Sequence, residues 1–316
     1  MALAAFSNLG RAAPDSHPSV TPEVIIDLGS GSFVIKGGQG FEEKNVRVFY
    51  HRPQNFSSVS PILIVLPGAG RNGDSYRDSW VAASERHGIL VLSPTYLEKD
   101  YDMAAYQFAG LVRNLELRNV RIEGNGQIYR MKDEDVAFEI NRAPTQWLFP
   151  DFDRLFEYVA TAVGSKQSGY DIFGHSAGGQ ILHRLAIFYP DSKAKRIVAS
   201  NSGLYTLPDL DVSLPFGVKD TAVSKQTLER SFRTNLVLLL GALDNENETR
   251  GIQTRTPKAD DQGIGRLAKG KYFYAESRKI AATLNAEFNW RLEVVPDVGH
   301  DQAKMAEAAA RFLYGK

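Results

Sequence analysis

The stretch YDIFGHSAGGQILHRL, residues 170–185, decides the fold of this chain. Its first four residues form an apolar run that predicts a buried strand, and the apolar periodicity after Gly178 predicts a helix. Between them, residues 174–178 match G-x-S-x-G. In that pattern a serine occupies a strained turn between strand and helix, where a side chain at either glycine would clash with backbone. Ser176 is therefore the predicted nucleophile; the alternative is a glycine-rich turn with a capping serine.

Strand and helix patterns alternate on both sides of this stretch. Apolar runs predict further buried strands at residues 61–68, 89–96, 196–202, 235–244 and 290–301. Periodic patterns predict helices at residues 78–88, 152–164, 178–189, 272–285 and 302–315. Strands that alternate with helices predict an α/β fold with a mostly parallel sheet covered on both faces. Three amino-terminal runs, 23–28, 33–37 and 45–52, predict strands that meander antiparallel.

Two insertions, residues 98–146 and 245–271, interrupt the alternation. Loops after the carboxyl ends of parallel strands build the binding site, so we expect both insertions to lie over the active face. Residues 23–316 are predicted to form one domain, a common size for an α/β fold. Residues 1–22 are predicted to be a flexible leader, which slightly favours a secreted or periplasmic protein over a cytoplasmic one.

Composition excludes several classes of function. The 316 residues carry 37 basic and 37 acidic side chains, so the net charge of zero does not favour nucleic acid or a membrane surface as partner. No apolar run reaches the roughly 18 residues that a membrane span needs. The absence of cysteine excludes disulfides, thiolate metal sites and a cysteine nucleophile. No dinucleotide-binding motif or histidine cluster at ligand spacing is present, so we expect neither a cofactor nor a metal.

A nucleophilic serine needs a base, and the base needs an acid to orient it. Two histidines follow Ser176. His183 lies two turns along the predicted helix and cannot easily reach back. His300 follows the last predicted strand in a glycine-containing loop, and we predict it as the general base.

The orienting acid should end a strand between the serine and the base. Asp244 lies just past the long apolar run of 235–241, and it is the predicted acid. Alternatives that remain open lie further into the same loop, after an earlier strand, or beside His300: Glu246, Glu248, Asp209, Asp211, Asp297 and Asp301.

Attack on an acyl carbon creates an oxyanion that needs two preorganised donors. One predicted donor is the backbone N–H of Ala177, directly after the serine. The other is the N–H of Ala69 in LPGAGRNG, residues 66–73, where glycines let the backbone approach a substrate. The alternative for this second segment is a plain glycine-rich turn.

These features together resemble the α/β-hydrolase superfamily over about residues 45–316. Within it, GAGRNGDSYRDSW (68–80) and GHSAGG (174–179) resemble bacterial polyhydroxybutyrate depolymerase-like hydrolases, a group that includes enzymes acting on poly(aspartic acid). The resemblance implies a serine hydrolase that forms an acyl-enzyme, endo-hydrolysis of β-amide bonds in poly(aspartic acid), and a homodimer. The alternatives are a carboxylesterase or polyester depolymerase, and a catalytically inactive hydrolase used for binding.

An anionic polymer as substrate would agree with a local excess of positive charge. The segment 249–271 has six basic residues against two acidic ones, a net charge of four positive: Arg250, Arg255, Lys258, Arg266, Lys269 and Lys271 against Asp260 and Asp261. With Arg71 and Arg77, which follow the predicted oxyanion loop, Arg250, Arg255 and Lys258 are the candidate substrate-binding cations of a positive rim. The alternative is that surface loops simply carry Lys and Arg.

The first insertion is rich in aromatic residues. Trp147, at its end, is a candidate to line the cleft. The favoured alternative is hydrophobic packing of a cap over the site.

Overall fold

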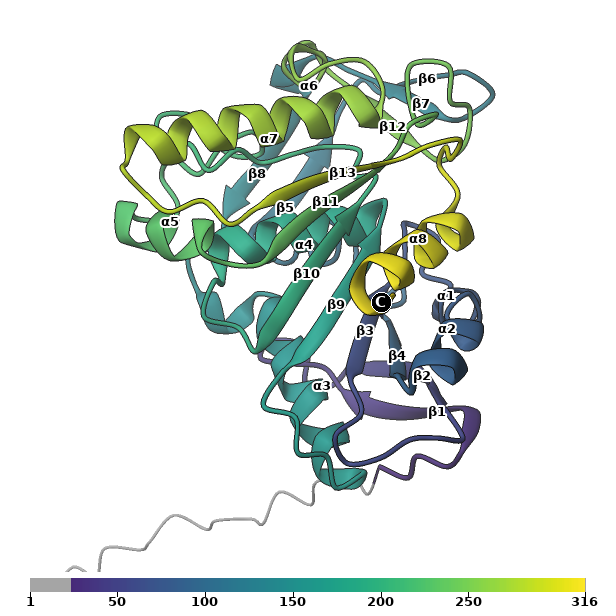
Figure 1. The fold of residues 1–316 in the computed structure, drawn as a ribbon. Helices are drawn as coiled ribbons and strands as arrows, with labels where there is room; N and C mark the ends of the chain where they lie inside the picture. Colours follow the sequence, from purple (N-terminus) through teal and green to yellow (C-terminus); the bar gives the residue numbers. More distant parts are fainter. Residues whose placement is uncertain (1–23, 316) are drawn as a thin grey trace, which may run out of the picture.

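An eight-stranded sheet forms the centre of the computed structural model, which describes residues 24–315 (Figure 1). The predicted leader, residues 1–22, lies outside the described residues. The strands, in spatial order, are β1 (Gly29–Lys36), β2 (Asn45–Arg52), β4 (Leu90–Thr95), β3 (Ile62–Leu66), β9 (Tyr170–His175), β10 (Ala194–Ser200), β11 (Leu236–Gly241) and β13 (Arg291–Val295). β2 pairs antiparallel with β1 and β4, and all other neighbouring strands are parallel. The predicted fold class is confirmed.

Helices cover both faces of the sheet, as the continuous apolar strands require. One face carries α1 (Gly73–Asp78), α2 (Val81–His87) and α8 (Gln302–Tyr314). The other carries α3 (Phe149–Ala162), α4 (Ala177–Phe188), α5 (Lys225–Phe232) and α7 (Arg266–Thr283). Alternate residues of a strand point to opposite faces. In β3, for example, Leu63 packs in the first layer, whereas Ile62 and Ile64 pack in the second.

The two insertions form two small sheets, one of which combines strands from both insertions. The first contributes β5 (Val112–Leu117), β6 (Arg121–Glu123), β7 (Ile128–Arg130) and β8 (Val136–Ile140), and the second contributes β12 (Gln253–Arg255) and α6 (Pro257–Asp261). β12 pairs with β7 in a three-stranded sheet, although 125 residues separate their first residues. β6, β7, β12 and α6 lie together at one end of the molecule, beyond β11 and β13 (Figure 1).

Three local predictions were wrong or incomplete. The described part of the predicted strand 23–28 is not a strand, and Ile25 and Leu28 are exposed because no neighbouring strand pairs with this segment. The predicted helix 78–88 is present as α2, which begins later, at Val81, whereas α1 before it was not predicted. Helix α5 was not predicted, because its short sequence has few apolar residues.

Candidate active site

Ser176 lies in the turn between β9 and α4. Its backbone has φ 58° and ψ −116°, a conformation that is costly for a residue with a side chain. A Cβ atom on Gly174 would lie 2.5 Å from the carbonyl of Gly178, and a Cβ atom on Gly178 would overlap the carbonyl oxygen of Leu66. Neither glycine can therefore carry a side chain, which is the steric reason for the G-x-S-x-G pattern.

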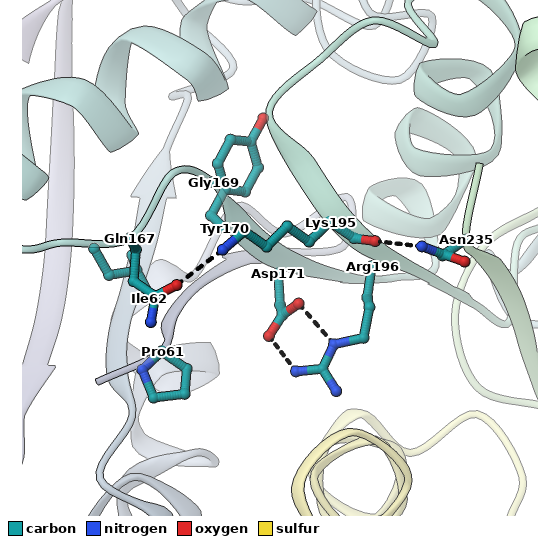
Figure 2. Close-up of a pocket in the computed structure, with 9 residues that line it drawn as sticks. All are labelled: Pro61, Ile62, Gln167, Gly169, Tyr170, Asp171, Lys195, Arg196 and Asn235. Carbon is teal, nitrogen blue, oxygen red and sulfur yellow. Dashed lines mark hydrogen bonds and ion pairs between the residues drawn. The ribbon is translucent and has the colours of Figure 1, made fainter. Parts of the chain in front are cut away.

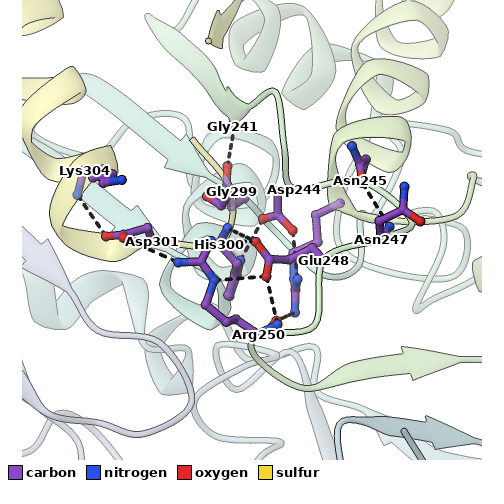
Figure 3. Close-up of polar contacts among 12 residues, drawn as sticks. Gly241, Asp244, Asn245, Asn247, Glu248, Arg250, Gly299, His300, Asp301 and Lys304 are labelled. Atoms are coloured by element: carbon purple, nitrogen blue, oxygen red, sulfur yellow. Dashed lines mark hydrogen bonds and ion pairs between the residues drawn. The ribbon is translucent and has the colours of Figure 1, made fainter. Parts of the chain in front are cut away.

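His300 and Asp244 form a direct hydrogen bond (Figure 3). Asp244 follows β11, His300 follows the neighbouring strand β13, and the distance between His300 Nδ1 and Asp244 Oδ2 is 2.7 Å. The Asp244 side chain is only 1% exposed. A buried carboxylate at Nδ1 fixes the imidazole orientation and leaves Nε2 to act as a base.

The serine turn lies beside this pair. His175, which precedes Ser176, has its ring centroid 4.4 Å from that of His300. Among the described residues, the Ser176 hydroxyl forms no hydrogen bond to a protein group. Hydrogen bonds of catalytic groups often form only when substrate is bound, so the arrangement remains compatible with proton transfer from Ser176 to His300.

Burial favours the neutral form of the candidate base. Desolvation lowers the pKa of His300 below its ordinary value, and the positive charge of Arg266 acts in the same direction. The hydrogen bond from His300 to Asp244 and the charge of that carboxylate oppose this shift. The resulting pKa, lower than usual, leaves the imidazole uncharged at neutral pH and able to accept a proton.

Both predicted oxyanion donors are near Ser176. Ala177 is the first residue of α4, where helix N–H groups lack partners within the helix. Ala69 follows β3 in the loop that passes the serine, and a Cβ atom on Gly68 would lie 3.4 Å from Ser176 Cβ. The glycine thus allows the loop backbone to approach the serine closely.

Arg71 and Arg77 do not belong to an exposed rim, and this expectation is corrected. Arg71 is buried, donates to the carbonyl oxygens of Tyr96 (2.7 Å) and Tyr101 (3.1 Å), and lies over the ring of Tyr106. Arg77 is also buried and donates to the carbonyl oxygen of Tyr50 at 2.8 Å. Both guanidinium groups donate to backbone carbonyls far away in sequence, so neither adds an exposed positive charge to the surface.

The cations of the second insertion also divide into groups. Arg266 and Lys269 are buried, so they add nothing to a surface charge. Arg255 pairs with Asp260 through its Nε and Nη2 atoms. Arg250 has a side chain that is 51% exposed but is paired with Glu248 and Asp301, whereas Lys258 is exposed. The net positive charge of this segment is therefore smaller at the surface than the sequence count indicated.

Trp147 packs in the interior instead of lining a cleft. Its Nε1–H donates to the carbonyl oxygen of Asn141 at 2.9 Å, and its ring meets those of Phe149 and Phe188 edge-on. His183 is buried as well; its Nε2 accepts the N–H of Thr206 at 3.0 Å. His183 is thus a packed residue, as its position along the helix suggested.

Sequence reasoning missed the roles of two residues at this site. Arg266 Nη1 donates to Asp244 Oδ1 at 2.9 Å, and Glu248 Oε2 accepts the backbone N–H of His300 at 2.7 Å. Arg266 was counted with the surface cations because it lies in the insertion before the predicted helix 272–285, and Glu248 was considered only as an alternative to Asp244.

A cavity of about 340 Å³ lies at the opposite end of the sheet (Figure 2). Its lining includes Ile62 and Tyr170, the first residues of β3 and β9, whereas Ser176 follows the last residue of β9. In residues 24–315, no group of acidic or histidine side chains is arranged to hold a metal ion. No helix of this part of the chain is long and apolar enough to cross a bilayer.

Comparisons with known proteins place the chain in a family. No protein-family model and no curated protein sequence matches it. Among solved structures, poly(aspartic acid) hydrolase-1 from Sphingomonas sp. KT-1 is 34% identical, with 92% of this chain and 100% of that chain covered and a TM-score of 0.78. LpqC, a poly(3-hydroxybutyrate) depolymerase from Bordetella parapertussis, is 24% identical, with 92% of each chain covered and a TM-score of 0.77.

The chain belongs to the same family of α/β-hydrolases as poly(aspartic acid) hydrolase-1. This α/β-hydrolase also has the fold of the siderophore hydrolase EstA from Aspergillus nidulans, at 11% identity, 98% and 99% coverage and a TM-score of 0.54. The likenesses to LpqC and EstA concern the fold alone. The relationship to poly(aspartic acid) hydrolase-1 spans that whole chain and supports hydrolase activity.

Proposed function

We propose that this α/β-hydrolase is a serine hydrolase that works through an acyl-enzyme, with Ser176 as nucleophile, His300 as base and Asp244 as orienting acid. The observation that carries the proposal is the buried 2.7 Å hydrogen bond between Asp244 and His300, next to a strained serine turn. Strain of this kind persists where the surrounding structure enforces it, and such sites are commonly functional.

Each proposed residue has one role in the first half of the reaction. His300 Nε2 takes the proton of the Ser176 hydroxyl while Oγ attacks the acyl carbon, and Asp244 stabilises the imidazolium that forms. The N–H groups of Ala177 and Ala69 hold the oxyanion of the tetrahedral intermediate.

Collapse of the intermediate releases the leaving group, which takes the proton from His300. Water then attacks the acyl-enzyme with His300 again as base, and Ser176 is regenerated. No step requires a cofactor or a metal ion.

We propose poly(aspartic acid) as the substrate, cleaved internally at its β-amide bonds. The support is the 34% identity to a poly(aspartic acid) hydrolase over that chain's full length, together with Arg250, a half-exposed cation whose partner Glu248 contacts the His300 backbone. Arg250 and Lys258 are the cations proposed to attract the polycarboxylate. We also propose a homodimer, which light scattering would test.

The test compares the sizes of products from poly(aspartic acid) and polyhydroxybutyrate, incubated in parallel with the wild type and Ser176→Ala. Endo-cleavage predicts an early fall in the mean length of poly(aspartic acid) before monomers accumulate, and no fall with the variant. Shortening of the polyester alone would overturn the substrate while keeping the mechanism. Shortening of either polymer by Ser176→Ala would overturn the nucleophile.

A further inference from the structure

We propose that Arg266 and Glu248, both from the insertion after β11, are positioning residues that hold the proposed base in its working geometry. Arg266 acts through the carboxylate of Asp244, and Glu248 acts through the backbone of His300. The inference rests on the proposed function, and it gives the 245–266 segment a role other than substrate attraction.

The Asp244 carboxylate has both oxygens occupied. Oδ1 accepts from Arg266 Nη1 at 2.9 Å, and Oδ2 accepts from His300 Nδ1 at 2.7 Å. The side chains of Asp244 and Arg266 are each 1% exposed, so water cannot replace either partner. A carboxylate held at both oxygens cannot rotate away from the imidazole, and Arg266 therefore fixes the direction of the bond to His300.

Arg266 is itself held by backbone carbonyls of the 245–266 segment. Its Nη2 donates to the carbonyl oxygens of Ile252 (3.1 Å) and Arg250 (3.3 Å). The next residue along α7, Leu267, donates its N–H to the carbonyl oxygen of Asp244 at 2.8 Å. A Cβ atom on Gly265 would overlap the backbone of Asn245, so the start of α7 packs directly against the loop of the acid.

Glu248 holds the backbone of His300 independently of Arg266. Its Oε2 accepts the N–H of His300 at 2.7 Å and also accepts from Arg250 Nη2 at 2.8 Å. The hydrogen bond with Arg250 lowers the pKa of Glu248 to about 2, so the acceptor stays ionised. A side chain on Gly299 would overlap the Glu248 carboxylate, which shows how closely the loop before His300 is held.

The two residues act on the charge of the imidazole in opposite directions. Arg266 disfavours the imidazolium and lowers the pKa of His300, whereas Glu248 raises it. The other charged or titratable groups around this ring are Asp244, Arg250 and Asp301 from the surrounding loops and His175 from β9. Replacing Arg266 by a neutral residue should therefore raise the pKa of His300, and replacing Glu248 should lower it. Residues with a purely structural role would not produce these opposite shifts.

The experiment compares Arg266→Gln and Glu248→Gln with Arg196→Gln, which breaks another arginine–aspartate pair far from the site. On a small neutral ester, we expect Arg266→Gln to lower kcat by about 10- to 100-fold with little change in KM, because misplacing a catalytic group costs that much. The acid limb of its pH–rate profile should move to higher pH, and the acid limb of the Glu248→Gln profile should move to lower pH. Arg196→Gln should change neither. A wild-type kcat and acid limb in Arg266→Gln and Glu248→Gln would overturn the proposal.

An NMR titration of His300 in a Ser176→Ala background separates this proposal from the proposed function, because it needs no hydrolysis. We expect the imidazole midpoint to rise in Arg266→Gln whether or not Ser176 is the nucleophile. Should Arg266→Gln fail to fold by circular dichroism, Arg266→Lys keeps the charge but not the fork of donors. It should lower kcat and leave the midpoint near that of the wild type. An unchanged kcat in Arg266→Lys, or a lower midpoint in Arg266→Gln, would contradict the positioning role.

Discussion

Two arginine–aspartate pairs occupy opposite ends of the same sheet. At the amino end, beside the cavity of Figure 2, Asp171 accepts from Arg196 and from the Tyr314 hydroxyl, the latter at 2.7 Å. At the carboxyl end, Asp244 accepts from His300 (Figure 3) and also from Arg266. Both carboxylates are buried and both have two kinds of donor.

The third partner makes the difference between the pairs. Burial raises the pKa of Tyr314 well above its ordinary value, so its hydroxyl keeps its proton. Burial lowers the pKa of His300, so its imidazole is neutral and can accept one. The same ion pair thus supports structure at one end, and at the other end it orients a group that can transfer a proton beside Ser176.

Neutralising each carboxylate in turn tests whether only the pair at the carboxyl end supports catalysis. Asp244→Asn should lower kcat by about four orders of magnitude, because the amide no longer selects the imidazole tautomer that accepts a proton at Nε2. Asp171→Asn should leave kcat within about twofold of the wild type, although it also leaves the partly buried Arg196 without its partner. Rates with a chromogenic ester measure both. Equal losses of kcat in the two variants would show that the loss in Asp244→Asn comes from impaired folding.

The pH dependence of kcat/KM tests whether His300, unlike Tyr314, can accept a proton. Because the pKa of His300 is lowered, kcat/KM should stay constant down to a pH below the ordinary histidine value near 6.5. It should then fall about tenfold for each further pH unit as the base becomes protonated. An acid limb well above pH 6.5 would contradict the assignment of His300.

The free energy of unfolding should also decrease when the buried histidines become protonated. His175, His183 and His300 all have pKa values lowered by burial, so the unfolded chain binds more protons than the folded one below about pH 6.5. The free energy of unfolding should therefore decrease as pH falls through this range. Denaturation in urea at pH 7.5 and pH 5.5 measures it, and greater stability at the lower pH would oppose the prediction.

The smallest expected effect concerns the exposed cations. Turnover of poly(aspartic acid) should fall severalfold between low and physiological salt, since screening weakens attraction between Arg250, Lys258 and the polymer. Lys258→Gln should reduce that salt dependence, and turnover of a neutral ester should hardly respond. A salt-independent rate with poly(aspartic acid) would remove the role proposed for these cations.

The sequence was sufficient for the parts of the molecule that periodicity and strand order determine. Continuous apolar runs identified the central strands, and parallel topology places their carboxyl ends at one edge, which is why Ser176, Asp244 and His300 could be named together. β11 and β13 prove to be neighbours, so Asp244 and His300 meet across one strand spacing.

The remainder depended on partners that are remote in sequence. Nothing beside Arg71 in the chain indicates that the carbonyls of Tyr96 and Tyr101 will surround it. In the same way, Arg266 counted as a surface cation until the packing of α7 against the Asp244 loop was known. The pairing of β7 with β12, each three residues long, left no periodic signal in either insertion.

The most direct test of the central claim is labelling with a fluorophosphonate probe, followed by mapping of the modified peptide. An activated serine attacks such a probe, so the wild type should carry one label on the peptide that contains Ser176, and Asp244→Asn should label far more slowly. Absence of labelling would favour a catalytically inactive binding protein. A label that survives Ser176→Ala would contradict the assignment of the nucleophile.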